Sequence, residues 1–376
     1  MDTHVEIDFG PGDRPARFAA PAGRITARDV AEAPEALAAL DAALAAGHWV
    51  AGYASYEAGY ALEPRLAPLM PAGRRLPLVD FGVFPRGPGP AVPVTPGGAL
   101  GALRPRWSRA EYATAFARAA DYVRAGDIYQ MNLTLPLDGQ WSGDPAAIAA
   151  TLARRQPVGF GAVVALGDTA LVSRSPELFF ALDGAGGIAA RPMKGTAPRD
   201  PDPARDADLA AALRRDAKNR AENLMIVDLL RNDIGRIAEI GSVAVPALFE
   251  VETYATVHQM VSRVAGRLRP GVGLARAFGA LFPCGSVTGA PKVRAMEIIR
   301  ELEPWPRDAY CGAIGWAAPD GRAAFNVAIR TLTLFPDGAA VLNVGGGIVA
   351  DSTAEAEYEE ALWKARFALP FPMGCS

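Results

Sequence analysis

A single lysine lies in the segment RPMKGTAPRD, residues 191–200, where Met193 and Gly195 flank it and a proline stands on either side. In such a loop a lysine is most often a solvated surface charge. The rest of the sequence has to decide whether Lys194 has a chemical role instead.

Carboxylates recur at helical spacing in two segments. Glu357 and Glu360 are three residues apart and Lys364 follows one turn later, so the three share a helix face. A solvated acidic face would explain this group alone. In NRAENLMIVDLLRND, however, Glu222 shares its predicted face with the apolar Met225, which is an unusual place for an unpaired charge. Carboxylates converging from two helices suit a hard divalent cation that keeps some of its waters, with magnesium as the natural choice.

A run of three glycines, residues 345–347, precedes the second of these helices. Ser352 and Glu355 form an S-x-x-E capping box, which predicts the helix start just after the run. A glycine-rich strand end that leads into a helix N-terminus leaves backbone N–H groups free to bind an anion such as a substrate carboxylate. GSVTGAPK, residues 285–292, is not a P-loop because its lysine does not directly follow the second glycine. The sequence therefore does not indicate an ATP or NAD site.

The elements that must position these residues favour an α+β fold. Short strand-like runs are joined by glycine-centred turns and helices are grouped rather than alternating, which favours antiparallel pairing. Ten prolines between Pro64 and Pro105 predict a linker or long loop. We expect residues 1–100 to form an N-terminal subdomain with this linker, and residues 101–376 to form the catalytic domain. Helices are predicted at 33–47, 109–125, 206–237 and 354–369.

The composition excludes several classes of partner. The 376 residues include 38 Lys and Arg against 41 Asp and Glu, with both signs interspersed and a net charge of −3, so nucleic acid and anionic membrane are poor candidates. Cys284, Cys311 and Cys375 are widely spaced, which indicates neither a disulfide framework nor a zinc site. The N-terminus lacks an export-signal pattern and no 18 apolar residues follow one another, so we expect a cytoplasmic protein.

Eight segments, in this order, closely resemble the motifs of the chorismate-utilising enzymes over about residues 108–369: SRSPELFF, RPMKGTAPR, AENLMIVDLLRNDIGR, VHQMVSRVAG, FPCGSVTGAPKVRAMEIIRELEP, YCGAIGW, AIRTL and GGGIVADSTAEAEYEEALWKA. Before residue 100 only GYASYEAGYALEP resembles this family. The resemblance implies two large, mostly antiparallel β-sheets packed face to face with helices outside. It also implies a magnesium-dependent site between the sheets, which would make residues 101–376 the chorismate-binding domain.

The resemblance assigns roles by matched position. Three carboxylates would hold the Mg²⁺ that binds the ring carboxylate of chorismate: Glu222, Glu357 and Glu360. Arg330, Tyr310 and the glycine backbone would contact the other carboxylate of chorismate. The full set of implied substrate-binding residues is Gly195, Thr196, His258, Tyr310, Arg330, Gly345, Gly346, Gly347 and Lys364. Lys194 and Glu177 would be the catalytic pair.

Lys194 and Gln130 discriminate between branches of the family. Members that make anthranilate resemble this chain but carry alanine at the position of Lys194, whereas members that aminate chorismate at C4 carry lysine. The implied reaction is attack of the Lys194 amine on C2, loss of the C4 hydroxyl with Glu177 as the general acid, and addition of ammonia at C4 with expulsion of the lysine. Relatives that add water place a lysine base at the position of Gln130, and glutamine cannot act as that base.

The expected activity is conversion of chorismate and ammonia to 4-amino-4-deoxychorismate, on the route to para-aminobenzoate and folate. No cysteine lies in a G-x-C-x-G elbow, so the resemblance implies a separate glutamine amidotransferase subunit as the ammonia source. One alternative is anthranilate formation, against which Lys194 argues. The other is a non-catalytic subunit that only binds ligand or partner, which would not need every acidic and lysine position to be filled.

Overall fold

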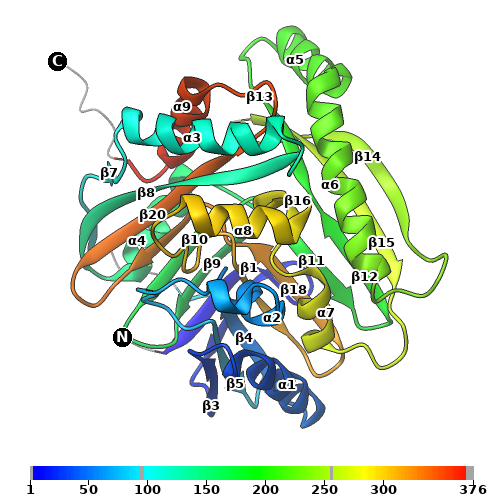
Figure 1. The fold of residues 1–376 in the computed structure, drawn as a ribbon. Helices are drawn as coiled ribbons and strands as arrows, with labels where there is room; N and C mark the ends of the chain where they lie inside the picture. The colour runs from blue at the N-terminus through cyan, green and yellow to red at the C-terminus, as the bar shows by residue number, and fades with distance from the viewer. Residues whose placement is uncertain (1–2, 93–96, 255–256, 370–376) are drawn as a thin grey trace.

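Two ten-stranded β-sheets form the centre of the molecule (Figure 1). The structure, a computed structural model, describes residues 3–92, 97–254 and 257–369. The strands of the first sheet, in spatial order, are β16 (Gly289–Ala290), β8 (Gln130–Gly143), β20 (Ala339–Ile348), β19 (Thr331–Leu334), β10 (Ala170–Ser175), β9 (Phe160–Ala165), β1 (His4–Gly10) and β2 (Arg14–Ala19), with β6 (Gly98–Leu100) and β7 (Arg104–Pro105) also paired to β8.

The second sheet is equally large and also antiparallel. Its strands, in spatial order, are β13 (Met193–Pro198), β15 (Val257–Arg267), β12 (Gly187–Arg191), β11 (Leu178–Asp183), β18 (Arg322–Val327), β17 (Ala313–Ala317), β4 (Trp49–Ala54), β5 (Val79–Phe84) and β3 (Gly23–Ala27), with β14 (Ala244–Thr253) also paired to β15. All strand pairings among the described residues are antiparallel. The predicted α+β class is confirmed.

A buried apolar cluster lies between the two sheets. Val5 and Val164 of the first sheet and Tyr53 and Trp316 of the second belong to it. Because alternate side chains of a strand point to opposite faces, β1, β9, β4 and β17 each contribute every second residue to this layer. The sheets therefore pack face to face, as predicted.

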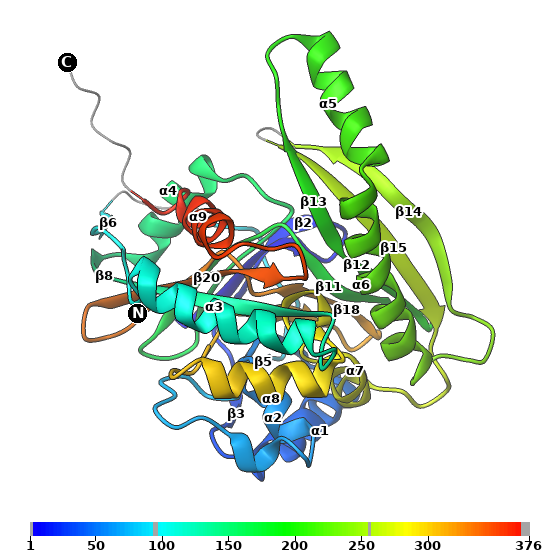
Figure 2. The same cartoon turned by 45° about the horizontal axis from the view of Figure 1, so that its top comes forward.

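Helices cover the outer sides of the sheets. In Figures 1 and 2, α3 runs along β8, α9 lies beside β20, and α5 and α6 lie along β13 and β15. The helices are α1 (Glu32–Ala45), α2 (Ala58–Leu62), α3 (Arg109–Arg124), α4 (Pro145–Arg155), α5 (Pro203–Arg215), α6 (Ala217–Gly235), α7 (Leu274–Leu281), α8 (Lys292–Leu302) and α9 (Ala354–Ala365), with the 3₁₀ helices η1 (Ala67–Leu69) and η2 (Gly285–Val287).

Two local predictions about helices are wrong. The single helix expected over residues 206–237 is divided, because Asp216 has an extended backbone and its side chain accepts a hydrogen bond from the Asn219 N–H, which makes it the N-cap of α6. The capping box is also wrong, because Thr353 caps α9 and the Ser352 hydroxyl donates to Glu357. In both cases a polar residue that the sequence pattern does not single out is the N-cap of the helix.

The predicted proline-rich linker is wrong in part. Strand β5 lies within it and is hydrogen-bonded to β4 on one side and β3 on the other. The run LVDFGVF, residues 78–84, is apolar enough to form a buried strand between the flanking prolines. Strands β1 and β2 join the first sheet and β3 to β5 join the second, so residues 4–84 contribute to both sheets. The division of the chain at residue 100 stays a prediction.

Cys284 and Cys311 are buried free thiols, whereas Cys375 lies outside the described residues. Within the described ranges, no helix is both long and apolar enough to cross a membrane.

Candidate active site

The chain crosses between the sheets at two adjacent places. Strand β10 of the first sheet leads to β11 of the second, and β18 of the second leads back to β19 of the first. Glu177 lies in the first crossing and Arg330 in the second. The crossings are hydrogen-bonded to each other, because the Arg174 N–H donates to the Arg330 carbonyl (2.9 Å) and the Val327 N–H donates to the Glu177 carbonyl (3.0 Å). The backbone thus brings Glu177 and Arg330 to one place.

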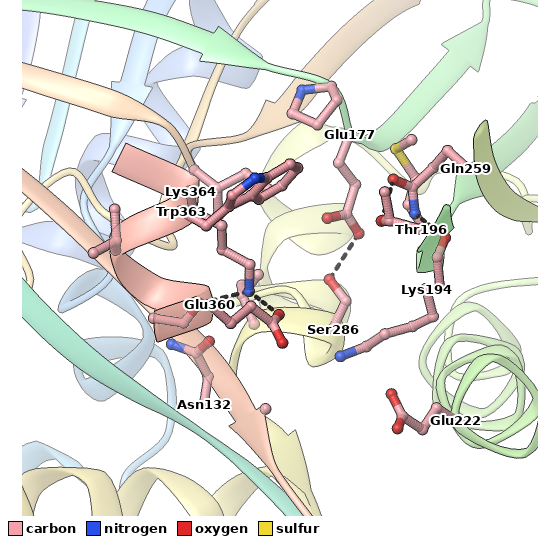
Figure 3. A pocket seen from close by; sticks show the side chains of 18 of the residues that line it. Asn132, Glu177, Lys194, Thr196, Glu222, Gln259, Ser286, Glu360, Trp363 and Lys364 are labelled. Carbon is pink, nitrogen blue, oxygen red and sulfur yellow. Dashed lines mark hydrogen bonds and ion pairs between the residues drawn. The ribbon is translucent and has the colours of Figure 1, made fainter. Parts of the chain in front are cut away.

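A cavity of about 760 Å³ opens at these crossings, a size suited to a small organic ligand. Most of the residues singled out from the sequence line it: Glu177, Lys194, Gly195, Thr196, Glu222, Tyr310, Arg330, Gly345, Gly347, Glu357, Glu360 and Lys364. They come from strands of both sheets and from α6 and α9. Figure 3 shows the side chains of several of them turned toward a shared space.

Lys194, on β13, reaches into this cavity. In Figure 3 its side chain extends toward the space between Ser286 and Glu222. A Cβ atom placed on Gly347 would lie 3.3 Å from the Lys194 Nζ, so the missing side chain at Gly347 makes room for the amine. Burial lowers the pKa of Lys194, although the negative charge of Glu222 acts in the opposite direction. An amine nucleophile requires a lowered pKa, and burial of Lys194 acts in that direction.

Glu177 is 4% exposed and has a high pKa for a carboxyl group. Burial raises its pKa to about 7, despite a hydrogen bond from Ser286 and the charge of Lys194, which both lower it. The Ser286 hydroxyl donates to Glu177 Oε1 at 2.8 Å. A carboxyl group with this pKa is partly protonated at neutral pH and can donate a proton.

Arg330 is a partly buried cation without an anionic partner among the described residues. Burial lowers the pKa of its guanidinium, and no carboxylate of the described residues forms an ion pair with it. Its backbone lies in the left-handed region, with φ of 50°, which is uncommon for a residue with a side chain. Tyr310 also lines the cavity and lies beside the glycine run, since a Cβ atom on Gly345 would be 3.1 Å from its hydroxyl oxygen. This part of the cavity can bind an anion.

Three carboxylates, Glu222, Glu357 and Glu360, line another part of the cavity and are called the acidic wall below. Burial raises the pKa of Glu222 and of Glu357, and the Glu360 charge adds to both shifts. Burial also acts to raise the pKa of Glu360, but Lys364 outweighs it and the pKa is lowered. The Lys364 Nζ lies 2.7 Å from Glu360 Oε1 and donates to the Gly345 carbonyl at 2.8 Å. Lys194 and Lys218 also lower the pKa values of Glu222 and Glu360, so lysines offset much of the negative charge of this wall.

The donor set of this wall fits magnesium, although its carboxylates are not arranged as a finished metal site. In the described parts of the chain, no three His, Cys, Asp or Glu side chains converge closely enough to hold an ion. Magnesium, however, usually keeps several waters and takes only one or two protein carboxylates together with groups of the substrate. The half-buried Glu222 and Glu357, whose charges repel each other, supply oxygen ligands of that kind.

His258 and Gly346 do not line the cavity. His258 is 2% exposed, with its Nε2 2.8 Å from Asp206 Oδ1 and its Nδ1 3.0 Å from Thr253 Oγ1. Gly346 faces α9, where an added Cβ atom would collide with Glu357 Oε2. The absence of a side chain at Gly346 therefore lets the Glu357 carboxylate lie against β20.

The glycine run lies at the C-terminal end of β20, where only Ile348 follows it within the strand. Its residues pair with β8 on one side, whereas β19 pairs with β20 only as far as Leu342. The second edge of the run is therefore free of strand partners, and backbone groups there are available to a ligand.

Several cavity residues were missed from the sequence. Ser286 lies in GSVTGAPK, which does not form a P-loop, and the sequence pattern assigns it no role. Gln259 braces the loop after Lys194, because its Nε2 donates to the Gly195 carbonyl (2.7 Å) and its Oε1 accepts from the Thr196 hydroxyl (2.9 Å). Five further polar or aromatic residues of the cavity wall belong to no chemical pattern in the sequence: Asn132, Lys218, Asn219, Asn343 and Trp363.

Comparison with known proteins gives a consistent assignment. Residues 90–370 match the family model described as chorismate binding enzyme. The chain is 47% identical over 259 residues to aminodeoxychorismate synthase component 1 of Escherichia coli, covering 68% of this chain and 56% of that protein. It is 42% identical over 284 residues to anthranilate synthase component 1 of Thermus thermophilus, covering 76% and 61%. The alignments thus span less than two thirds of these curated relatives.

A solved structure has the same architecture. Anthranilate synthase component I from Streptococcus pneumoniae superimposes with a TM-score of 0.81 at 25% sequence identity, covering 97% of this chain and 92% of that one. The match includes the N-terminal strands as well as the region that matches the family model.

Proposed function

Because the chain belongs to the chorismate binding enzymes, we propose that it converts chorismate and ammonia to 4-amino-4-deoxychorismate. The observation that carries this proposal is the distribution of lysine. The chain has only four lysines among its 38 basic residues, and three of them, Lys194, Lys218 and Lys364, line the cavity. Arginine stays protonated and cannot replace lysine as a nucleophile. Lysine is therefore concentrated where an amine has a chemical use.

Chorismate has two carboxylates, and the cavity has two regions for them. Arg330 and Tyr310, with the open edge of the glycine run, would bind the carboxylate of the enolpyruvyl side chain. The ring carboxylate would lie at the acidic wall, where Glu222, Glu357 and Glu360 would hold Mg²⁺. The bound metal would supply positive charge to that carboxylate. Gly195 and Thr196, braced by Gln259, would contact the substrate beside Lys194.

The reaction assigns one step to each of two side chains. The neutral Lys194 amine forms a bond to C2 of the ring, the two ring double bonds shift, and the C4–O bond breaks. Glu177 gives its proton to the departing hydroxyl, which leaves as water, and the new ammonium on Lys194 loses a proton. Ammonia then bonds to C4, the double bonds shift back, and the C2–N bond breaks. The proton that the new C4 ammonium loses is balanced by the proton that the leaving nitrogen gains, so Lys194 is released as a neutral amine.

Ammonia rather than water is the proposed incoming nucleophile. Gln130 is fully buried, and neither polar atom of its amide has a hydrogen-bond partner among the described residues. A Cβ atom on Gly347 would lie 2.9 Å from the Gln130 Nε2, so the amide is next to the Lys194 amine across this glycine. An amide cannot remove a proton from water, which argues against hydroxylation. A separate glutamine amidotransferase would provide the ammonia in the cell.

Anthranilate formation is the second candidate, because the chain is 42% identical to anthranilate synthase component 1 of Thermus thermophilus. That reaction adds ammonia at C2 directly and has no need of a lysine at the same carbon. An amine beside C2 would obstruct it, so Lys194 favours amination at C4.

The test combines product analysis with a covalent trap. Purified protein with chorismate, Mg²⁺ and an ammonium salt should form 4-amino-4-deoxychorismate, identified by mass spectrometry, and Lys194→Ala should not. Without ammonia, the native protein should gain the mass of chorismate less one water on the peptide that contains Lys194. Lys292→Ala is the matched control, because Lys292 is paired with Asp233 away from the cavity. Anthranilate or a hydroxylated product from the native protein would refute the proposal.

A further inference from the structure

Ser286 is the side-chain hydrogen-bond partner of Glu177 among the described residues, and it comes from a distant part of the chain. Its hydroxyl donates to Glu177 Oε1 at 2.8 Å across a separation of 109 residues. Ser286 is 6% exposed and Glu177 4%, so water has little access to the bond. Both residues line the cavity. A hydrogen bond between two such buried groups fixes the orientation of the carboxyl group.

The hydroxyl of Ser286 is itself oriented by a thiol. Cys284 Sγ lies 3.2 Å from Ser286 Oγ. Burial raises the pKa of Cys284 to about 12, so its S–H proton is present throughout the neutral range. Because an ionised carboxylate can only accept, the Ser286 proton is directed to Glu177 and the Cys284 proton to Ser286. The donors therefore run in one direction, from Cys284 through Ser286 to Glu177.

We infer that Ser286 is a positioning residue, which occupies Oε1 of Glu177 and thereby keeps Oε2 as the oxygen that carries and delivers the proton. A protonated carboxyl group has one proton and two oxygens, and an oxygen that accepts a strong hydrogen bond is the poorer site for that proton. Delivery from the second oxygen leaves Glu177 as a carboxylate and releases the substrate hydroxyl as water. This role of the proton rests on the proposed function, whereas the hydrogen bond itself does not.

The other groups that face Glu177 do not replace this contact. Lys194 and the Met193 backbone also lower the pKa of Glu177, but each lowers it less than Ser286 does. The backbone of Glu177 is held by a separate contact, because its N–H donates to Ser175 Oγ at 3.2 Å. Removing the Ser286 hydroxyl would therefore leave Glu177 in place but free its Oε1.

The variants Ser286→Ala and Ser286→Thr separate positioning from packing. In Ser286→Ala, loss of a donor to the charged form should raise the pKa of Glu177 by about one pH unit. The decline of kcat at high pH should move upward equally, and kcat at neutral pH should fall about tenfold. Ser286→Thr keeps a hydroxyl and should restore both properties. KM for chorismate should change less than kcat.

Thr288→Val is the matched control, because the Thr288 hydroxyl lies in the same buried loop but donates to the Cys284 carbonyl rather than to Glu177. It should alter stability without moving the pH profile. Profiles are measured at constant free ammonia, so that the titration of ammonium does not enter. An equal fall and an equal pH shift in Thr288→Val and Ser286→Ala would overturn the inference, since a disturbed loop would then explain both.

A measurement without substrate distinguishes this inference from the proposed function. The carboxyl band of Glu177, identified by its loss in Glu177→Gln, is followed by infrared difference spectroscopy against pH in the free protein. Its midpoint should rise in Ser286→Ala and return in Ser286→Thr. An unmoved midpoint refutes the positioning role, whatever product the enzyme makes. A moved midpoint together with a different native product would refute only the proposed reaction.

Discussion

Arg330→Gln is expected to weaken chorismate binding by about two orders of magnitude while leaving the free protein no less stable. Arg330 is a partly buried guanidinium whose pKa is lowered by loss of contact with water, and no carboxylate of the described residues forms an ion pair with it. In the free protein its charge is therefore an unfavourable feature of the fold. A substrate carboxylate would provide the missing partner. Glutamine keeps a polar side chain of similar reach, and it leaves the left-handed backbone at this position unchanged.

The size of the effect follows from the kind of contact that is lost. Truncating one partner of a buried, hydrogen-bonded charge pair typically costs about 2–5 kcal/mol. A loss of about 3 kcal/mol corresponds to roughly 100-fold in KM for chorismate. The free protein loses the aliphatic part of the side chain but is relieved of an unpaired charge, so its free energy of unfolding should stay the same or rise.

Steady-state kinetics and urea unfolding measure the two parts. Arg322→Gln is the matched control, because Arg322 lies on the strand before this crossing and pairs with Asp320 at the surface. It should leave KM unchanged. A KM within about threefold of the native value in Arg330→Gln, or a loss of more than about 2 kcal/mol in the free protein, would refute the reasoning. The second result would mean that Arg330 stabilises the fold rather than awaiting a ligand.

Three further outcomes are expected. The pKa of Glu177 is raised from 4.5 to about 7. The contribution of the protonated Glu177 to stability is therefore complete below pH 4.5 and is lost as pH rises through 7. In urea titrations the free energy of unfolding of the native protein, relative to Glu177→Gln, should fall by about 3 kcal/mol between pH 4 and 8. Gln259→Met removes the hydrogen bond to the Gly195 carbonyl and should raise KM about tenfold without moving the pH profile of kcat; a shifted profile would contradict this. Gly346→Ala drives a methyl group against Glu357 Oε2 and should raise the Mg²⁺ concentration for half-maximal activity about tenfold; an unchanged titration would argue against a metal role for that carboxylate.

Much of the fold was predictable from local patterns. The helix over residues 109–125 matches α3 closely, because Ser108 and Glu111 form a capping box that is complete within one turn. The antiparallel arrangement followed from short turns between strands. The division at Asp216 was not predictable, because an aspartate within a helical pattern is tolerated in a helix and also favoured as an N-cap. Only the packing of α5 and α6 on the second sheet chooses between these states.

The candidate site was predictable in its side chains but not in its contacts. Lys194, Glu177 and the three carboxylates stand in recognisable motifs, so their identities and order along the chain pointed to a chorismate enzyme without a structure. His258 stands in a motif as well, yet both of its ring nitrogens are engaged by neighbours outside the cavity. A motif identifies a residue type at a position, whereas its hydrogen-bond partners depend on what the fold brings beside it.

Tertiary structure alone decided the relations on which the chemistry depends. Sequence placed Glu177 after one strand and Arg330 after another, and only the pairing of β10 with β19 and of β11 with β18 makes them neighbours. The same holds for Ser286, which reaches Glu177 across 109 residues. Local spacing determines which residues share a strand or helix face, because that geometry is periodic. Burial, the absence of a counter-ion at Arg330 and the resulting pKa shifts belong to the assembled interior, because each depends on which distant groups exclude water from the same place.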